Sequence, residues 1–388
     1  MSANMFVAHG GGPTPVINSS LQGAVEEARK HGAIKKIFGA RFGAEGILNN
    51  DLMDLTGTPA GVIAKLGQTP ASALGSCRRK LAADDYPKVL ECFRKNDIRW
   101  FFYNGGNDSM DTCNQISLLA QKSGFELNVI GIPKTIDNDL AETDHSPGYG
   151  SAARYAAISA LELAMDAASL PIHVVTMEAM GRNAGWITAA CGLFQKAMPC
   201  EFMVCLPEHL HDRKTLLGQI EAAWKKKRGV LVAVSEGIKD EKGTPYGDTG
   251  IKDGFGHIIA GGAAQAVTDL IIGELNIKSR SEKPGLLGRV SMACVSEVDR
   301  KEAYDAGAFA VKNAAEGKTG FMVAITAERS PRYISKMTLV PLEKVANVEQ
   351  KFPDKWLKGP GLGFTEDFAA YCRPLVDLPM PEYAYLGN

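Results

Sequence analysis

Short runs of β-branched and aromatic residues recur along the chain, and amphipathic stretches with helical spacing follow them. This alternation is the pattern of a parallel sheet covered by helices, so it predicts an α/β fold. The predicted strands begin at Met5, Ile34, Trp100, Asn128, Ile172, Phe202, Gly229, Gly285 and Gly320. The predicted helices span residues 16–31, 109–122, 150–168, 213–227, 256–274 and 300–316.

These strands are too many for one sheet around a single core in a chain of 388 residues. We therefore expect two doubly wound lobes with mostly parallel sheets and an active-site cleft between them. Residues 1–149 are expected to form the larger lobe, to which residues 256–316 return, and residues 150–255 to form the smaller one. Residues 317–388 are expected to add a strand and a proline-rich extension that wraps the body.

The composition restricts the partners of the protein. The formal net charge is -1, which gives no electrostatic reason to expect nucleic acid or an anionic membrane as a partner. The first residues lack the pattern of a signal peptide and no apolar run approaches a bilayer span, so a cytoplasmic location is expected. The cysteines form no Cys-x-x-Cys pair, which indicates reduced core thiols.

Residues 133–140, Pro-Lys-Thr-Ile-Asp-Asn-Asp-Leu, follow the apolar run 129–132. If that run is a buried strand of an open α/β sheet, these polar residues lie at the edge where ligands bind. Two aspartates beside Lys134 suit phosphoryl transfer, because one carboxylate can accept a proton and the other can hold a magnesium ion. For the octapeptide taken alone, the alternative is an Asx-rich turn without a further role.

Two glycine-rich segments, residues 9–15 and 103–109, also stand between a predicted strand and a predicted helix. Glycines at such a turn let backbone amides approach a phosphate, and the helix N-terminus adds partial positive charge. The first segment lacks the Gly-x-Gly-x-x-Gly spacing of a dinucleotide site. In the second, Asn107 and Asp108 are candidate ligands of a metal that bridges phosphates, while Asp108 or Ser109 as a helix cap is the alternative.

Three further polar sites carry weaker signals. Arg182, after the strand predicted from Ile172, suits a phosphate or developing charge, and a turn-capping arginine is the alternative. Glu236 ends a buried-looking strand and suits sugar hydroxyls, although acids are also common at helix starts. The basic cluster Gly75–Lys80 faces either phosphate or solvent, and its spacing does not decide between them.

Together these segments resemble the phosphofructokinase family over nearly the whole chain, from Gly10 to about Glu316. The motifs occur in the order of that family, and their combination is far more specific than any one of them. They are the glycine loop with Pro15 and Asn18, Gly75–Arg78, Gly105–Ser109, Thr135–Asp139, Met180–Arg182 and Glu236.

The resemblance implies roles for individual residues. Asp137 is expected to deprotonate the 1-hydroxyl of fructose 6-phosphate, while Lys134, Thr135 and Arg182 act on the transferring phosphoryl group. Mg²⁺ is the expected cofactor, near Asn107, Asp108 and Asp139. The larger lobe is expected to bind the phosphoryl donor through Gly11, Gly12, Arg78, Asp108 and Ser109. The smaller lobe is the expected sugar-phosphate side, and the expected substrate-binding residues are Thr135, Asp137, Met180, Gly181, Arg182, Glu236 and Arg289.

Two positions favour pyrophosphate over ATP as the donor. ATP-dependent members of the family typically carry glycine where this chain has Asp108 and Lys134. A carboxylate at position 108 repels a nucleotide α-phosphate, and a lysine at position 134 supplies charge to a short donor. The chain therefore resembles the pyrophosphate-dependent branch, which implies reversible phosphorylation of fructose 6-phosphate to fructose 1,6-bisphosphate in glycolysis and gluconeogenesis.

Three alternatives to this function remain at the level of the sequence. An ATP-dependent 6-phosphofructokinase is the nearest one and would have to tolerate Asp108 and Lys134. A catalytically silent regulatory subunit is disfavoured by the intact Asp137, Asp139 and Arg182. A nicotinamide dehydrogenase is disfavoured by the missing dinucleotide fingerprint.

Some positions depart from the pattern of the family. Asn107 replaces the usual aspartate, which weakens a direct metal contact. Met292 replaces an arginine that usually meets the sugar 6-phosphate, and the expected substitutes are Arg289, Lys283 or Arg280. His173 stands where bacterial ATP-dependent enzymes carry an arginine that reaches a neighbouring subunit. A homodimer or homotetramer is expected.

The helix predicted after the first glycine loop also departs from the regulated members of the family. Gln22 and Glu26 replace arginines that bind effector phosphates in regulated bacterial ATP-dependent enzymes. A carboxylate at position 26 repels such phosphates. Weak or absent control by ADP or phosphoenolpyruvate is therefore expected.

Overall fold

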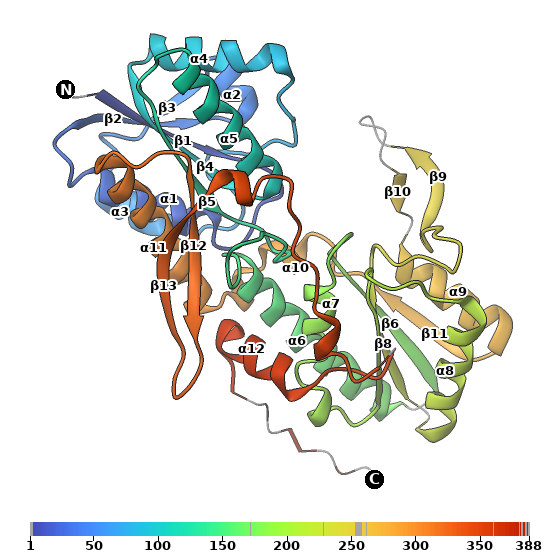
Figure 1. Cartoon of the computed structure of the whole chain (residues 1–388). Coiled ribbons are helices and arrows are strands. Elements are labelled where there is room, and N and C mark those ends of the chain that lie inside the picture. Colours follow the sequence, from blue (N-terminus) through green and yellow to red (C-terminus); the bar gives the residue numbers. More distant parts are fainter. Residues whose placement is uncertain are drawn as a thin grey trace. The chain divides into compact units, whose positions relative to one another are not determined.

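The computed structural model describes residues 3–170, 172–227, 229–252, 258–260, 262–359, 361–379, 381, 383, 384 and 386. The chain divides into two compact units (Figure 1). Residues 1–151 and 289–350 form the first unit, and residues 152–288 and 351–388 form the second. The predicted α/β fold is confirmed, because each unit contains a sheet of mostly parallel strands together with covering helices.

The described residues of the first unit form a seven-stranded sheet with the order β13-β12-β5-β4-β1-β2-β3. Its inner strands are parallel, and each of the two edge strands runs antiparallel to its neighbour. The strands β1, β4 and β5 are apolar almost throughout because both of their faces are covered. The bounds are β1 (Ala3–His9), β2 (Ile34–Ala40), β3 (Leu52–Asp54), β4 (Ile98–Gly105), β5 (Asn128–Pro133), β12 (Phe321–Glu328) and β13 (Ile334–Pro341).

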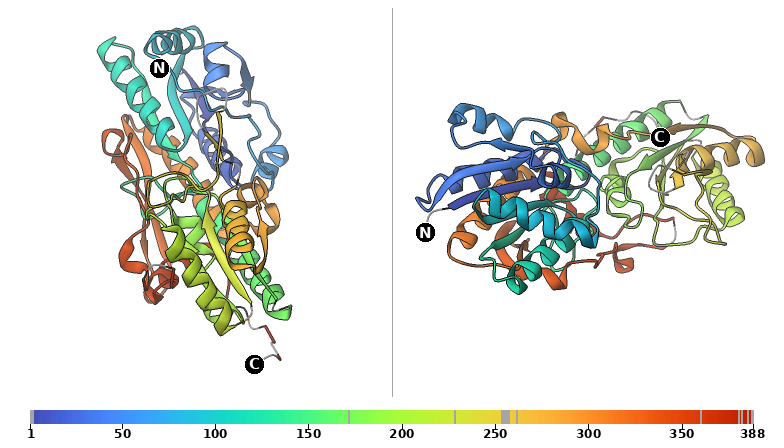
Figure 2. Two further views of the ribbon diagram at one scale, coloured as in Figure 1. Left: turned by 90° about the vertical axis from the view of Figure 1, so that its right-hand side faces the viewer. Right: turned by 90° about the horizontal axis from the view of Figure 1, so that it is seen from above.

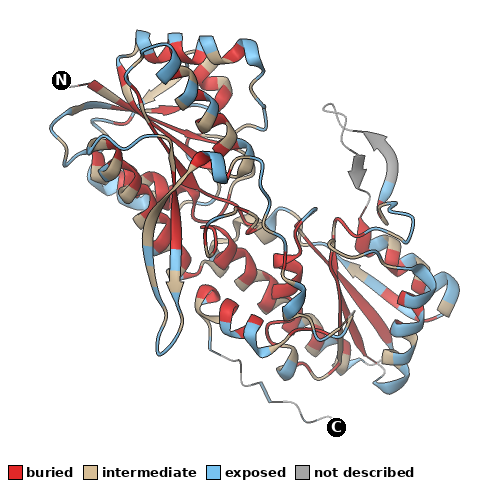
Figure 3. Cartoon of the chain, in the orientation of Figure 1, coloured by how far each residue is buried: buried red, intermediate tan, exposed pale blue. Residues whose placement is uncertain are grey.

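Helices cover both faces of this sheet (Figure 2). One core lies under α2, α4 and α5, where the rings of Phe6, Phe93 and Phe101 contact one another. The core on the other face lies under α1, α3 and α11. Figure 3 shows the buried strands between the partly exposed helices. The bounds are α1 (Ile17–Ala28), α2 (Ala44–Leu48), α3 (Ala60–Leu66), α4 (Tyr86–Lys95), α5 (Asn107–Lys122) and α11 (Glu297–Ala315).

The second unit contains a parallel four-stranded sheet with the order β11-β6-β8-β7. The helices α8 and α9 pack on one of its faces. The strands are β6 (His173–Ala179), β7 (Glu201–Cys205), β8 (Val230–Ser235) and β11 (Lys278–Glu282), with a separate antiparallel pair β9 (Asp248–Lys252) and β10 (Ile258–Ala260). The helices are α7 (Trp186–Ala190), α8 (Arg213–Lys226), α9 (Ala263–Leu275) and α12 (Glu366–Val376), while α6 (Tyr149–Ser169) and α10 (Leu287–Val290) begin in one unit and end in the other. No helix in the described part of the chain has the length and apolar character needed to cross a membrane.

The proline-rich C-terminal segment packs in the second unit through aromatic rings. Trp186 in α7 contacts Phe352, Trp356 and Tyr371 at centroid distances of 5.3, 5.9 and 5.5 Å. Phe364 contacts Phe352 in turn, at 5.6 Å. Such aromatic contacts stabilise beyond the area that they bury, so this segment adds a core of its own to the second unit.

Several predicted boundaries differ from the structure. The strand predicted from Gly285 is wrong, because the chain forms the short helix α10 there and the strand β11 lies earlier. The helix predicted from residue 256 begins at Ala263; residues 256 and 257 lie outside the described part of the chain.

The division into units also differs from the expected lobes. Residues 256–288 join the second unit, because β11 pairs with β6 and α9 packs on the same sheet. Residues 317–350 join the first unit, because β12 pairs with β5. The aromatic contacts of residues from Phe352 onward account for the return of the chain to the second unit.

Candidate active site

The glycine loop after β1, residues 10–12, is held by the segment 75–78. The Gly11 amide donates to the Cys77 carbonyl at 3.0 Å, and the Ser76 hydroxyl donates to the Gly11 carbonyl at 2.7 Å. Gly11 has a φ of 74°, a left-handed conformation in which a side chain would be strained. The structure therefore brings two of the sequence motifs together and fixes the backbone of the loop.

Three cationic side chains converge on this glycine loop. Lys134 Nζ donates to the Gly12 carbonyl at 2.8 Å. A Cβ atom on Gly12 would lie 3.0 Å from Arg289 Nη1 and 3.8 Å from Arg78 Nη2, so glycine leaves room for both guanidinium groups. Arg289 was expected at the sugar phosphate, and the structure places its guanidinium beside Gly12. Cations around a glycine turn form a site suited to phosphate oxygens.

Lys134 is almost completely buried, with 3% of its surface exposed. Burial, together with the positive charges of Arg289 and Arg78, lowers the pKa of its ammonium group to about 8. Asp137 and Asp139 act in the opposite direction. A bound polyanion would favour the charged lysine, because an opposite charge nearby raises the pKa of a cation.

The Asp137 loop, residues 135–148, follows β5 and folds back on itself. Thr135 Oγ1 accepts from the Asp137 amide at 3.1 Å, and the Thr135 amide donates to the Pro147 carbonyl at 3.2 Å. Asn138 adopts a φ of 54°, and its Oδ1 accepts from the Ser146 amide at 2.9 Å. Asp137 is half-buried between these two anchored residues. Its backbone is therefore held on both sides, while the residue as a whole is only partly buried.

Asn107 and Asp139 have the chemistry of a divalent-cation site. Asn107 Nδ2 donates to Asp139 Oδ2 at 3.3 Å, so the two side chains are neighbours. Asn107 Oδ1 and Asp139 Oδ1 are both buried, and neither has a hydrogen-bond partner among the described residues. Burial raises the pKa of Asp139. Two unsatisfied buried oxygens fit a hard cation such as Mg²⁺, which takes one or two side-chain ligands and completes its shell with phosphates and water.

In the described part of the chain, no group of three or more histidine, cysteine or acidic side chains is placed to hold a metal ion. A cation at Asn107 and Asp139 would therefore depend on further oxygens from a ligand, from water or from the backbone. This dependence is typical of magnesium at phosphoryl-transfer sites.

The other two candidate residues at the start of α5 have different surroundings. Asp108 is exposed and its Oδ1 lies 2.7 Å from Lys80 Nζ. Ser109 is buried, and its Oγ occupies the space that a Cβ atom on Gly10 or Gly105 would need. Neither residue caps the helix, since Gly106 holds the cap position and no side chain bonds there. The two glycine segments therefore pack directly against each other through Ser109.

In the second unit, the ends of β6 and β8 bring the segment 180–182 next to Glu236. The Gly181 amide donates to Glu236 Oε1 at 3.4 Å, and Ser235 Oγ donates to the Gly181 carbonyl at 2.7 Å. Gly181 has a φ of 120°. Met180 and Glu236 are half-buried and Arg182 is exposed, so all three can reach a ligand. The arrangement offers a cation and a carboxylate on one edge of the sheet.

Two buried or partly buried acidic residues, Glu208 and Glu178, support these motifs although no sequence pattern points to them. Glu208 Oε1 accepts from the Gly185 amide at 2.8 Å and from the Phe352 amide at 2.9 Å, so it ties the loop after β6 to the C-terminal segment. Lys283, an expected substitute for the missing phosphate-binding arginine, pairs with the buried Glu178 at 2.8 Å. Acidic residues are mostly exposed, and only the folded structure shows which ones are buried.

The chain matches the family model described as phosphofructokinase over residues 4–314. It is 39% identical to a pyrophosphate--fructose 6-phosphate 1-phosphotransferase of Xanthomonas campestris pv. campestris, and the match covers 100% of this chain and 97% of that protein. A protein of the same name from Halomonas elongata is 39% identical, with 96% and 91% covered. The crystal structure of a pyrophosphate-dependent phosphofructokinase from Nitrosospira multiformis superposes with a TM-score of 0.90 and 36% identity, covering 99% of this chain and 94% of that one. The chain therefore belongs to the phosphofructokinase family.

Proposed function

We propose that this protein is a pyrophosphate:fructose-6-phosphate 1-phosphotransferase that works in both directions. The observation that carries the proposal is the convergence of Lys134, Arg78 and Arg289 on the glycine loop of the first unit. Pyrophosphate has no adenosine to anchor it, so the site must hold it through charge. The names of the relatives with 39% identity over almost the whole chain support the same reaction.

Asp108 supplies the selection against ATP in this proposal. Its carboxylate is exposed in the first turn of α5, next to the second glycine segment. A negative charge there repels the additional phosphate of a nucleotide, and the loss of affinity for the wrong donor produces specificity. Lys80 pairs with Asp108 and reduces this repulsion only in part, because both groups are solvated.

Asp137 acts as the general base in the proposed reaction. It takes the proton from the sugar 1-hydroxyl as that oxygen attacks the terminal phosphorus of pyrophosphate, and the bond to the leaving phosphate breaks. Lys134, Thr135 and Arg182 stabilise the charge on the transferring group. Asn107 and Asp139 would hold Mg²⁺, which supplies charge neutralisation to the phosphate oxygens. In the reverse direction, Asp137 returns the proton to the sugar oxygen.

The acceptor is bound in the second unit in this proposal. Glu236 accepts hydrogen bonds from sugar hydroxyls, and Met180 and Gly181 shape the loop around the sugar ring. Glu236 is already held by the Gly181 amide, so its carboxylate is oriented before the substrate arrives. Arg289 is assigned to the donor side, because its guanidinium lies at Gly12.

A donor comparison tests the proposal. Wild-type enzyme is assayed with fructose 6-phosphate and either pyrophosphate or ATP, and the variant Asp108→Gly is assayed in the same way. We expect a large preference of the wild type for pyrophosphate, and we expect Asp108→Gly to narrow it mainly by a gain of activity with ATP. Lys80→Met is the matched control, because it removes the partner of Asp108 and leaves the repelling charge.

Two outcomes would contradict the proposal. If the wild type used ATP as well as pyrophosphate, the ATP-dependent alternative would replace it. If Asp108→Gly left the ratio of the two activities unchanged, Asp108 would have no part in the choice of donor.

A further inference from the structure

A buried ionic cluster lies in the first unit, apart from the cations at the glycine loop. His145 Nδ1 lies 2.8 Å from Asp144 Oδ1, and His145 Nε2 lies 2.7 Å from Glu302 Oε2. The side chains of His145 and Glu302 are only 1% and 4% exposed. Each ring nitrogen therefore faces a carboxylate in an environment that contains little water.

The cluster continues to the connection between β12 and β13. Arg329 donates two hydrogen bonds to Asp144, at 2.8 and 2.6 Å. The Tyr333 hydroxyl donates to Glu302 Oε1 at 2.6 Å, and its ring centroid lies 6.5 Å from that of His145. Two carboxylates and one guanidinium leave one negative charge, which a protonated imidazole balances. Buried charges need such pairing, because an unpaired one is strongly destabilising.

The geometry is consistent with a charged histidine. Burial alone would lower the pKa of His145, but the charge of Glu302 and the hydrogen bonds to Asp144 and Glu302 outweigh it and raise the pKa to about 9. Arg329 and Tyr333 approach from the connection after β12, and Glu302 from α11. Asp299, one turn before Glu302 on α11, is buried and adds a further negative charge when it is ionised.

This cluster holds the returning half of the Asp137 loop, residues 143–148. The next residue after His145 is Ser146, whose amide donates to Asn138 Oδ1, and Pro147 accepts from the Thr135 amide. The Gly148 amide then donates to Asp299 Oδ1 at 2.8 Å. Thr135 and Asn138, which lie on either side of Asp137 in the loop, are thus anchored to residues 143–148. That segment is itself fixed to α11 and to the β12–β13 connection.

We propose that His145 is a positioning residue for phosphoryl transfer, which acts as a buried imidazolium that clamps residues 143–148 between α11 and the β12–β13 connection and thereby fixes the carboxylate of Asp137. The inference rests on the proposed role of Asp137 as the base. A displacement of about 1 Å at a reacting group costs up to about 10²-fold in rate, so loosening this clamp reaches the chemistry without touching a substrate.

The test compares three variants, His145→Gln, Glu302→Gln and the double variant of these two, with the control variant His31→Gln. His31 forms a histidine–glutamate pair with Glu27 on α1, at 3.1 Å, and is the matched control. We expect kcat to fall by roughly 10- to 100-fold in the first three variants, with KM for both substrates changed by less than about threefold. The double variant should be no slower than the slower single variant, because the two residues act as one unit. His31→Gln should keep the wild-type kcat.

Circular dichroism and the melting temperature establish that each variant is folded at the assay temperature. If the folded variants kept kcat within twofold of the wild type, His145 would have a structural role only and the inference would fail. Tyr333→Phe, which loses one hydroxyl, covers the case in which the charge variants do not fold. It should lower kcat a few-fold at unchanged KM, and an unchanged kcat would then overturn the inference.

The result is separate from the identity of the donor. If the wild type proved to use ATP, the proposed function would fail, and the same variants would be compared with ATP. Asp137→Asn is the reference in either case. If it retained more than half of the wild-type turnover, the role of Asp137 would fail, and with it the basis of the His145 inference.

Discussion

Lys134 shows how a single residue in this site is prepared for a polyanion. It is buried among other cations, and its hydrogen bond to the Gly12 carbonyl orients the ammonium group on the glycine loop. The same burial that lowers its pKa also removes the water that would screen its charge. A phosphate group that enters this site therefore meets a cation with few competing contacts.

The titration of Lys134 gives a prediction about pH. Because its pKa is lowered to about 8, the charge is present below that pH and is lost as the pH rises through it. The value of kcat/KM for pyrophosphate, which reports the free enzyme, should fall over the same range. Lys134→Arg keeps its charge at every accessible pH and should lack this decline, although at lower activity.

Steady-state rates measured in one buffer series from pH 6 to about 10 check this expectation. This range covers the lowered pKa of Lys134 and approaches the ordinary pKa of lysine. Pyrophosphate itself titrates, so the relevant quantity is the ratio of wild type to Lys134→Arg at each pH. A constant ratio across the range would show that Lys134 does not titrate in the free enzyme.

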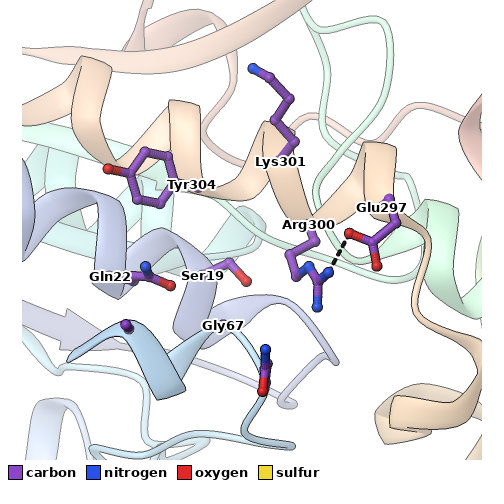
Figure 4. A pocket seen from close by; sticks show the side chains of 9 residues that line it. Ser19, Gln22, Gly67, Glu297, Arg300, Lys301 and Tyr304 are labelled. Carbon is purple, nitrogen blue, oxygen red and sulfur yellow. Dashed lines mark hydrogen bonds and ion pairs between the residues drawn. The ribbon is translucent and has the colours of Figure 1, made fainter. Parts of the chain in front are cut away.

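At the scale of elements, the helices α1, α3 and α11 line an open pocket of about 230 Å³ (Figure 4). Ser19, Gln22, Arg300, Lys301 and Tyr304 are among the residues that line it. The charges in and around the pocket are already paired. Arg300 pairs with Glu297 and Lys301 with Asp305.

These pairs predict a weak response to phosphorylated effectors. Gln22 donates to Glu26 at 3.0 Å and Tyr304 donates to Glu26 at 2.7 Å, so a carboxylate, which repels phosphate groups, lies beside two residues of the pocket. We expect hyperbolic saturation with fructose 6-phosphate, unchanged by ADP or phosphoenolpyruvate. Initial rates over a range of fructose 6-phosphate check this. A sigmoidal curve that either effector shifts several-fold would contradict it.

The elements also show what the sequence can and cannot reveal. The strands β1, β4 and β5 were predictable because both of their faces are buried and their residues are apolar almost throughout. The strand β11, Lys-Ser-Arg-Ser-Glu, was missed because it is an edge strand with mostly polar, partly exposed residues. The apolar Leu286 and Leu287 nearby, which are largely exposed in the structure, suggested a strand in the wrong place.

Part of the candidate active site could likewise be predicted from the sequence, and part of it could not. The motifs at the ends of β1, β4 and β5 were predictable because parallel strands bring their carboxyl ends to one edge. The contact of Arg289 with the glycine loop was not, because it joins segments far apart in the chain and depends on where the short helix α10 lies. The cluster around His145 was missed for the same reason, since Glu302, Arg329 and Tyr333 come from distant elements.

At the scale of the whole molecule, the ionic cluster predicts how stability depends on pH. The raised pKa of His145 contributes stability that is fully present below its unfolded value of 6.5 and is lost as the pH rises through about 9. Burial alone would raise the pKa of Asp144, but hydrogen bonds from Arg329 and His145 lower it to about 2. Its contribution is present above 3.8 and is lost as the pH falls through about 2.

The measurement is the melting temperature as a function of pH for the wild type and for His145→Gln. The difference between the two should be largest between the unfolded pKa values of Asp144 and His145, and it should shrink as the pH rises through about 9. Other groups, such as Asp299 with a pKa raised by burial to about 6, titrate in both proteins and largely cancel in the difference. A difference that stays constant up to pH 10 would argue against a charged His145.

The division of the chain also orders the events of its synthesis. The first unit needs residues as late as Pro341 to complete its sheet, whereas the strands of the second unit lie between residues 173 and 282. During translation, the second sheet can therefore form before β12 and β13, the last two strands of the first sheet, have left the ribosome. Pairings between distant segments are slow to form. A nascent chain stalled after residue 320 would expose the edge of β5 where β12 belongs, and an unpaired strand edge of this kind favours aggregation.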